Sequence, residues 1–239
     1  MDTPRYISVL RLSGEDLASF AEGDLGRPVP SCPEWDMADL VWHTAEVHYF
    51  WRSIVSGAIT GPDEYTEPER PDEGELLAWY RDGLAETARV LADADPSAGC
   101  WTWASRKDVG FVQRRMAQET AVHSWDAAMA VGHDRPLPSD VAVDGVSEFL
   151  EHMLSAGTHP EEPVGNVALR STDTRDVWSA SFDEKGWRIA RTVEPAAATA
   201  SAPASDLLLA LWRRKGTNAL EVTGDADALA RFLDVAETE

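Results

Sequence analysis

Cysteines and basic residues are both scarce in this sequence, and each shortage excludes a class of protein. Two cysteines, Cys32 and Cys100, in 239 residues cannot build a disulfide framework. Lysine and arginine together number 21 against 42 aspartates and glutamates, so the formal net charge is -21. A chain with this charge repels phosphate backbones and anionic lipid surfaces. We therefore expect no nucleic-acid or membrane partner.

Long apolar segments are also missing. No apolar run approaches the roughly 20 residues that cross a bilayer. The first residues, Met1-Asp-Thr-Pro-Arg-Tyr6, do not show the basic and then apolar pattern of a signal peptide. Hydrophobic residues nevertheless make up 44% of the chain and include ten tryptophans, enough for one large core or two smaller ones. We expect a soluble, cytoplasmic protein.

The first half of the chain has the periodicity of helices. Apolar residues recur at helical spacing in these stretches: 4–22, 37–56, 74–93 and 110–132. Asp36, three residues before Asp39, is the expected N-cap of the second helix, with Asp39 in the capping-box position. The polar segment 57–73, rich in proline and glycine, predicts a loop.

The second half mixes two periodicities. Alternation with period two predicts strands at 167–171, 178–182 and 187–191, with a further strand at 220–222. Helical spacing predicts helices at 144–154, 204–214 and 225–236. A break is expected at 157–166, and the small residues of 195–203 predict a loop or flexible edge. The chain therefore reads as two domains, mainly α and then α+β.

The run Glu119-Thr-Ala-Val-His123 in the predicted 110–132 helix is the strongest chemical signal. Side chains four residues apart lie on the same face of a helix, so this pair could grip one divalent metal. The same spacing suits an ordinary surface ion pair. Ala121 and Val122 make the setting apolar, where an unpaired carboxylate is costly and a metal relieves that cost.

A third ligand is available upstream, in Asp39-Leu-Val-Trp-His43-Thr-Ala-Glu-Val-His48. His43 and His48 point roughly 140° apart around a helix, so they do not face the same metal. The spacing by itself does not choose between them. Two histidines and one glutamate would make a catalytic type of zinc site, because three protein ligands leave the fourth position open.

Several charged residues have two possible roles. Glu46 and Asp126, each three residues from a histidine, could orient the imidazoles or remain solvated. Arg115 could pair with Glu119 or hold an anion at the mouth of the site. The basic run 213–215 could simply complement the C-terminus of the preceding helix.

These residues together resemble the mycothiol-dependent maleylpyruvate isomerase family. The first half carries the resemblance in two segments, Val29-Pro-Ser-Cys-Pro-Glu-Trp-Asp-Met-Ala-Asp-Leu-Val-Trp-His43 and Arg115-Met-Ala-Gln-Glu-Thr-Ala-Val-His-Ser-Trp-Asp126. The second half is similar to the family's second domain at 144–150, 204–214 and 222–225. The resemblance implies a DinB-like, metal-binding, up-and-down four-helix bundle at 1–142 and a sterol-carrier-like α/β domain at 143–239.

The resemblance also implies the site. His43, Glu119 and His123 would bind zinc or another divalent metal. Mycothiol would be the thiol cofactor. Arg213 or Arg214, the basic residues after the leucine-rich helix of the second domain, would reach the metal site from across the domain interface. Arg214, with Arg115 as a further candidate, would hold substrate carboxylates.

The implied reaction is an isomerisation. The thiolate adds to the cis double bond of a keto-dicarboxylic acid such as maleylpyruvate, the new single bond rotates, and elimination of the thiol leaves the trans isomer. Two alternatives stay open: an S-transferase that acts on electrophiles, and a protein that binds a metal or small ligand without turnover. The expected partners are a small thiol and a small electrophilic or unsaturated acid. The chain would be a monomer or a homodimer.

Overall fold

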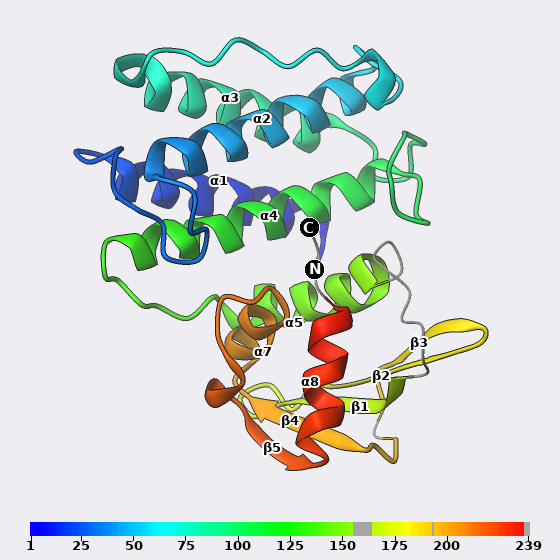
Figure 1. Cartoon of the computed structure of the whole chain (residues 1–239). Coiled ribbons are helices and arrows are strands. Elements are labelled where there is room, and N and C mark those ends of the chain that lie inside the picture. Colours follow the sequence, from blue (N-terminus) through cyan, green and yellow to red (C-terminus); the bar gives the residue numbers. More distant parts are fainter. Residues whose placement is uncertain (155–163, 193, 237–239) are drawn as a thin grey trace. The chain divides into compact units, whose positions relative to one another are not determined.

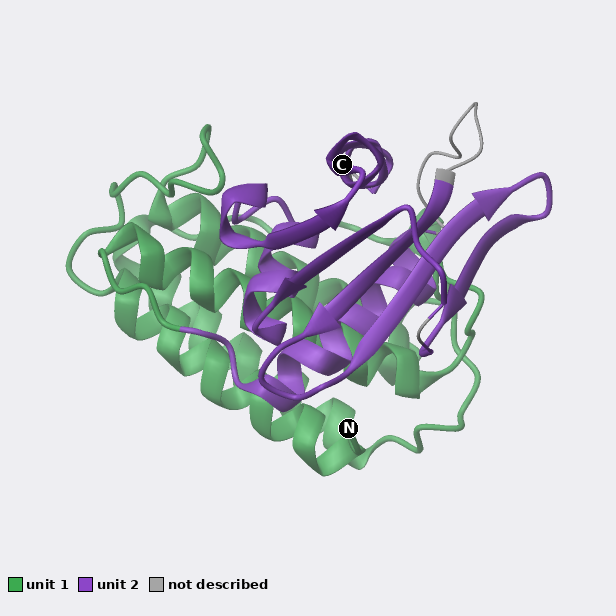
Figure 2. Cartoon of the chain, turned by 90° about the horizontal axis from the view of Figure 1, so that it is seen from below, with its two compact units in different colours: residues 1–135 green, residues 136–239 purple. Residues whose placement is uncertain are grey.

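The chain forms two compact units. A computed structural model describes residues 1–154, 164–192 and 194–236 (Figure 1). The first unit spans Met1–Arg135 and the second Pro136–Glu239 (Figure 2). None of the helices in the described ranges is long and apolar enough to cross a membrane. We predicted a helical part followed by a part that mixes strands and helices, and the structure confirms this order.

The first unit is helical throughout its regular structure. Its long helices are α1 (Thr3–Ala21), α2 (Met37–Ser56), α3 (Glu73–Asp93) and α4 (Val109–Ala130), with a short 3₁₀ turn, η1, at Pro62–Glu64. The four helices predicted from apolar spacing are therefore present, with ends shifted by no more than two residues. Helices α1 and α2 each contact both α3 and α4. Their shared core contains the fully buried Leu10, Leu40, Tyr80, Leu91 and Met116.

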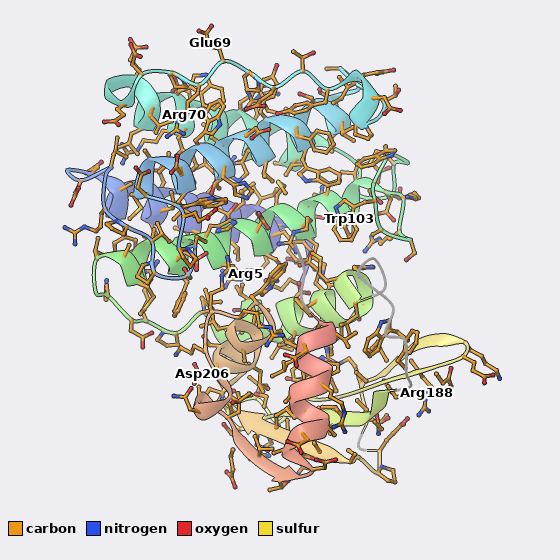
Figure 3. All side chains as sticks on the ribbon, viewed as in Figure 1. Arg5, Glu69, Arg70, Trp103, Arg188 and Asp206 are labelled. Carbon is orange, nitrogen blue, oxygen red and sulfur yellow. The ribbon has the colours of Figure 1, made fainter. Side chains whose placement is uncertain are left out.

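Helix α2 begins at a well-defined cap. The carboxylate of Asp36 accepts the backbone N–H of Asp39 at 2.9 Å, and the carboxylate of Asp39 accepts the N–H of Asp36 at 3.3 Å. This reciprocal pair satisfies backbone donors that the first helical turn leaves unpaired. Asp39 also binds Arg70 at 2.8 Å, a residue of the segment that precedes α3 (Figure 3). The predicted capping box is confirmed, and it sets where α2 starts.

The second unit contains a mixed sheet. In the described residues its strands are β1 (Val164–Ser171), β2 (Val177–Asp183), β3 (Gly186–Ala190), β4 (Ala198–Ala202) and β5 (Glu221–Gly224). Their order is β3-β2-β1-β4-β5, in which only the β1–β4 pair is parallel. The helices of this unit are α5 (Ser139–Glu148), α7 (Ala204–Leu211) and α8 (Ala226–Val235). Helices α7 and α8 both pack on β1 and β4 (Figure 1).

Two predicted elements of the second unit were wrong in detail. The stretch 195–203, expected to be a loop, contains strand β4, which lies between β1 and β5. Its alternate residues Ala198, Ala200 and Ala202 are buried, but alanine has a low strand propensity, so the alternation was not recognised. The helix expected at 144–154 is continuous with α5 but changes to a π-helix at Phe149–Met153. Most of the break expected at 157–166 lies outside the described residues, and its last three residues, 164–166, belong to β1 instead.

Candidate metal centre

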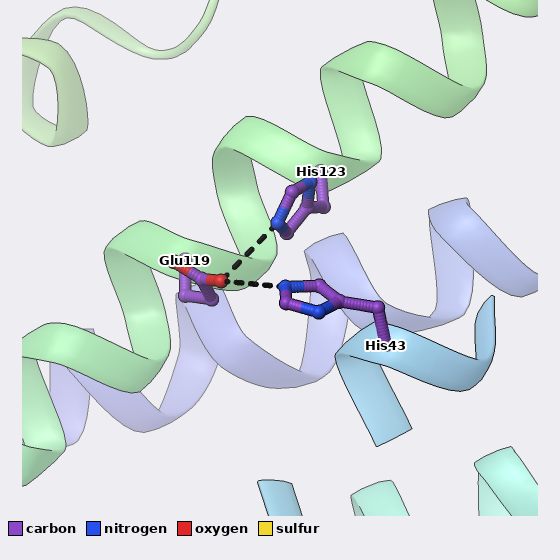
Figure 4. A group of neighbouring side chains, drawn as sticks. All are labelled: His43, Glu119 and His123. Carbon is purple, nitrogen blue, oxygen red and sulfur yellow. Dashed lines mark hydrogen bonds and ion pairs between the residues drawn. The ribbon is translucent and has the colours of Figure 1, made fainter. Parts of the chain in front are cut away.

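Three side chains from two helices converge in the first unit. His43 extends from α2, and Glu119 and His123 extend from α4 (Figure 4). The Nε2 atoms of His43 and His123 lie 3.4 and 3.1 Å from the same oxygen, Oε1 of Glu119. One ligand atom from each residue falls within 4.8 Å of the others. Side chains separated by 76 positions therefore meet at one point.

The spacing of these donor atoms suits a divalent metal. Zinc bonds to nitrogen and oxygen are about 2.0–2.2 Å long, so neighbouring donors of a tetrahedral site lie about 3.4 Å apart. The two separations from Glu119 Oε1, 3.1 and 3.4 Å, are close to this value. Two imidazoles and one carboxylate leave a fourth position for water, a thiol or a substrate. The group fits the donor set of an open zinc site.

A buried carboxylate orients one of the histidines. Nδ1 of His123 donates to Oδ2 of Asp126 at 3.0 Å, and Asp126 is completely buried. When Nδ1 carries the proton of a neutral imidazole, Nε2 presents its lone pair to Glu119. Two acceptors facing each other at 3.1 Å need a positive charge between them, either a proton or a metal ion. From the sequence, Asp126 could either orient an imidazole or be a solvated charge. Its side chain is buried and bonded to His123, so the structure agrees with the orienting role.

The charges around His123 and Glu119 stabilise each other. Burial lowers the pKa of His123, but the nearby carboxylates of Glu119 and Asp126 outweigh it and raise the pKa to about 9. Burial alone would raise the pKa of Glu119, yet the two histidines and Arg115 bring it well below its usual value. Both shifts favour a charged imidazole beside a charged carboxylate, so the site favours positive charge next to Glu119.

Arg115 is the partner of Glu119. Its guanidinium donates to Oε2 of Glu119 at 2.8 Å, so the carboxylate uses one oxygen for Arg115 and the other for the histidines. Of the two roles considered for Arg115, the ion pair is the one seen in the structure. This contact holds the glutamate side chain in one orientation, which leaves Oε1 directed at both imidazoles.

A loop that the sequence did not connect with the site also reaches it. The segment 27–36, which we call the α2 entry loop, precedes α2. Its Trp35 ring lies 4.8 Å from the ring of His43, and its Ser31 hydroxyl donates to Asp126 at 2.6 Å. The segment from Val29 to His43 carries part of the family resemblance, but nothing in the sequence alone assigned a role to Ser31 or Trp35.

His48 and Glu46 do not take part in the convergence. His48 is fully buried, and its Nε2 binds the hydroxyl of Thr120 at 2.8 Å. Burial lowers the pKa of His48 to about 3, so this imidazole is neutral. Glu46 accepts from the hydroxyl of Tyr65 at 3.3 Å and does not orient His43, contrary to the first of its two expected roles.

Two of the three arginines expected to hold substrate, Arg213 and Arg214, belong to the second unit. Arg213 follows α7 with a left-handed φ of 59°, a position that glycine usually takes at a helix end. Its guanidinium binds the backbone oxygen of Leu233 and, at 3.2 Å, the carboxylate of Asp234, near the end of α8. Arg214 donates to the backbone oxygen of Trp212 at 2.9 Å. Their roles toward a substrate stay predictions.

Comparisons with solved structures show a similar fold in known proteins. The crystal structure of a mycothiol-dependent maleylpyruvate isomerase matches with a TM-score of 0.65 and 11% sequence identity, covering 95% of both chains. A variant of such an isomerase with a histidine replaced by alanine matches with a TM-score of 0.64 and 10% identity, again over 95% of both chains. At these identities the likeness concerns the fold. A comparison with curated proteins gave no match.

Family models account for most of the sequence. Residues 10–128 match the mycothiol maleylpyruvate isomerase N-terminal domain, which includes all three converging side chains. Residues 140–231 match the C-terminal domain of the same family. The order of the two matches is the order of the two compact units. The chain therefore belongs to the mycothiol-dependent maleylpyruvate isomerase family.

Proposed function

We propose that this protein is a zinc- and thiol-dependent isomerase that acts on an unsaturated keto-dicarboxylic acid such as maleylpyruvate, with mycothiol as the thiol. The observation that carries the proposal is the meeting of His43, Glu119 and His123 in a member of this family. A catalytic metal needs an open coordination position, and three protein ligands, here two histidines and one glutamate, leave the fourth position of a zinc ion open. The structurally similar crystal structure is of a mycothiol-dependent maleylpyruvate isomerase, which supports the choice of thiol and substrate.

The chemistry divides between the chain and its two small partners. His43, Glu119 and His123 would hold the cation, Asp126 orients His123, and Arg115 orients Glu119. A divalent metal held there lowers the pKa of a thiol at its open position, so that the thiolate is available near neutral pH. The thiol supplies the nucleophile, whose addition to the cis double bond leaves a single bond free to rotate and whose elimination gives the trans isomer.

Arg214 is the residue that we assign to the substrate carboxylate. A chain with a net charge of -21 repels a dicarboxylate at long range, so binding needs a local arginine. The resemblance leaves this role to Arg214 or Arg213; the guanidinium of Arg213 binds the end of α8, and that of Arg214 binds the backbone oxygen of Trp212. Arg115 is likewise occupied by Glu119.

The finer architecture belongs to the same proposal. We assign the first unit to a DinB-like up-and-down four-helix bundle and the second to a sterol-carrier-like α+β domain. The boundary expected at 142/143 lies inside α5, so we place it between Arg135 and Pro136. The mutual contacts of α1 to α4 and the mixed sheet with its helices support these assignments. We expect the enzyme to act in the cytoplasm as a monomer or homodimer.

The first test is metal content and thiol-dependent turnover. Wild-type protein purified without a histidine tag should hold about one zinc per chain, as expected for a single three-ligand site, and His43→Ala should lose it. Elemental mass spectrometry measures both. A wild type that holds no metal even after zinc is added back would remove the isomerase proposal and favour a binding protein without turnover. Thiol label retained in the released product would indicate an S-transferase.

The second test separates the arginines. Arg214→Ala should lower kcat/KM by about 10- to 150-fold, because a hydrogen bond to a charged group contributes about 1.5–3 kcal/mol. Its zinc content should not change. Arg213→Ala is the matched variant, and it should lower stability by about 1 kcal/mol with little loss of turnover. Equal kinetic losses in both variants would contradict the assignment of Arg214.

A further inference from the structure

The α2 entry loop contacts the ring of one candidate ligand, His43, and the carboxylate that binds the other histidine, His123. Trp35 lies against the ring of His43, with ring centroids 4.8 Å apart. Ser31 donates its hydroxyl proton to Oδ1 of Asp126 at 2.6 Å, and Oδ2 of the same carboxylate accepts from Nδ1 of His123 at 3.0 Å. A continuous chain of hydrogen bonds therefore runs from the loop to a metal ligand.

The position of Asp126 explains why a second anchor matters. Asp126 lies three residues after His123 on α4, so the two side chains can meet on one face of the helix. The helix backbone does not by itself fix the rotation of a carboxylate about its side-chain bonds. Ser31, which is 95 residues away in the sequence, holds the other oxygen. With one oxygen held by Ser31, the remaining oxygen is directed at the imidazole.

The loop that carries Ser31 is itself held by backbone hydrogen bonds. The N–H of Val29 donates to the oxygen of Trp35 at 3.0 Å, and the N–H of Trp35 donates to the oxygen of Cys32 at 2.9 Å. The N–H of Cys32 returns to the oxygen of Val29 at 3.0 Å. Pro30 and Pro33 restrict the backbone further. Ser31 is thus presented from a stiff turn closed at both ends.

We propose that Ser31 is a positioning residue for the metal ligand His123, acting through the buried carboxylate of Asp126, so that the α2 entry loop sets how tightly the site holds a divalent cation. The proposal rests on the metal site of the proposed function. Groups that orient a ligating histidine change metal affinity by about 10- to 100-fold when they are removed. Ser31 acts one contact further out, so its effect is smaller than that of Asp126.

The test measures the affinity for Co²⁺, which takes the nitrogen and oxygen ligands that zinc takes. Chelator competition gives the dissociation constant, and the visible absorption of bound Co²⁺ reports the ligand geometry. Asp126→Asn should weaken binding by about 10- to 100-fold. Ser31→Ala should weaken it by about 3- to 10-fold, within the lower part of that range. Ser31→Thr, which keeps a hydroxyl, should restore affinity and absorption.

Two comparisons separate positioning from a general loss of stability. Ser53 on α2 is half-buried, and its hydroxyl donates to the backbone oxygen of Tyr49 at 2.8 Å. Ser53→Ala also removes a serine hydroxyl and its hydrogen bond, here one to a neutral backbone oxygen away from Asp126, and should leave Co²⁺ affinity unchanged. The double variant Ser31→Ala with Asp126→Asn should bind no more weakly than Asp126→Asn alone, because both act through one contact.

The outcomes distinguish the inference from the proposed function. If wild type binds Co²⁺, His123→Ala loses it, and Ser31→Ala binds like wild type, the metal site stands and the role of Ser31 is overturned. Losses that simply add in the double variant would also overturn it. A wild type that takes up no Co²⁺, like His123→Ala, would overturn both the metal site of the proposed function and the role of Ser31.

Discussion

Two histidines of α2, His43 and His48, have opposite environments although they lie five residues apart. The side chain of His43 is 34% exposed and points at Glu119. His48 is completely buried, and its Nε2 binds Thr120, a neighbour of Glu119 on α4. Among the described residues, Nδ1 of His48 has no hydrogen-bond partner. One histidine is therefore available to a cation, and the other joins α2 to α4 as a neutral group.

The buried state of His48 predicts a dependence of stability on pH. Its pKa is about 3 in the folded protein against 6.5 for a model histidine. The unfolded chain therefore binds more protons between these values, so stability falls as the pH drops below about 6.5. Between pH 7 and pH 5 this single group should cost about 2 kcal/mol.

His48→Gln isolates that effect, since glutamine stays neutral and can still donate to Thr120. Urea unfolding at pH 7 and pH 5 should show wild type losing about 2 kcal/mol more than the variant. All other titrating groups are shared, so their contributions cancel in the comparison. Equal losses in both proteins would mean that His48 is not buried in its neutral form.

At the scale of elements, the start of α2 determines which residues face α4. The capping box of Asp36 and Asp39 fixes the first turn, and His43 follows one turn later on the same helix. The α2 entry loop ends at this cap. The N–H of Met37, the first residue of α2, donates to the backbone oxygen of Arg27 at 2.9 Å and ties the start of the loop to the start of the helix. A helix that began elsewhere would still form, but the loop and its Ser31 would no longer be held beside α4.

Removing the cap should therefore weaken the first unit. Asp36→Ala should lower the free energy of unfolding by about 1 kcal/mol, because the N–H of Asp39 loses its acceptor. Asp36→Asn keeps an acceptor oxygen and should lose only a small part of this. Thermal or urea unfolding measures both variants. Equal stability of Asp36→Ala and wild type would show that the capping box contributes nothing.

At the scale of the molecule, the three candidate ligands all belong to the unit Met1–Arg135. Both helices that carry them contribute to its core, so a bound cation would link α2 and α4 directly. The sheet unit contributes none of these ligands. A metal that binds only the folded site stabilises the elements that form it.

Metal removal should therefore affect the two units unequally. Zinc at 100 times its dissociation constant should raise the free energy of opening α2 and α4 by about 2.7 kcal/mol over the chelated protein. Strands β1 and β2 should change little. Hydrogen exchange resolved by segment measures both, and His123→Ala should abolish the difference. Equal protection of the helices and the sheet would contradict a site held by the first unit alone.

Local patterns in the sequence predicted much of the fold. The helices of the first unit, the capping box and the pairing of Glu119 with His123 all depend on residues within one turn or one helix. Such contacts follow from helical geometry, so periodicity is enough to find them. Strand β4 was missed because its alanines give little signal, and only its pairing with β1 and β5 makes it a strand.

The sequence by itself determined the acidic charge, the helical first half and the Glu119–His123 pair on one helix face. Helical spacing left the choice between His43 and His48 open, and the family resemblance favoured His43. Only the tertiary structure decided that His43 meets this pair while His48 is buried against Thr120, and that Ser31 holds Asp126. Helical spacing acts within a few residues, whereas these contacts join positions 76 and 95 residues apart. They exist because α2 and its entry loop are packed against α4 in one register, which no local pattern specifies.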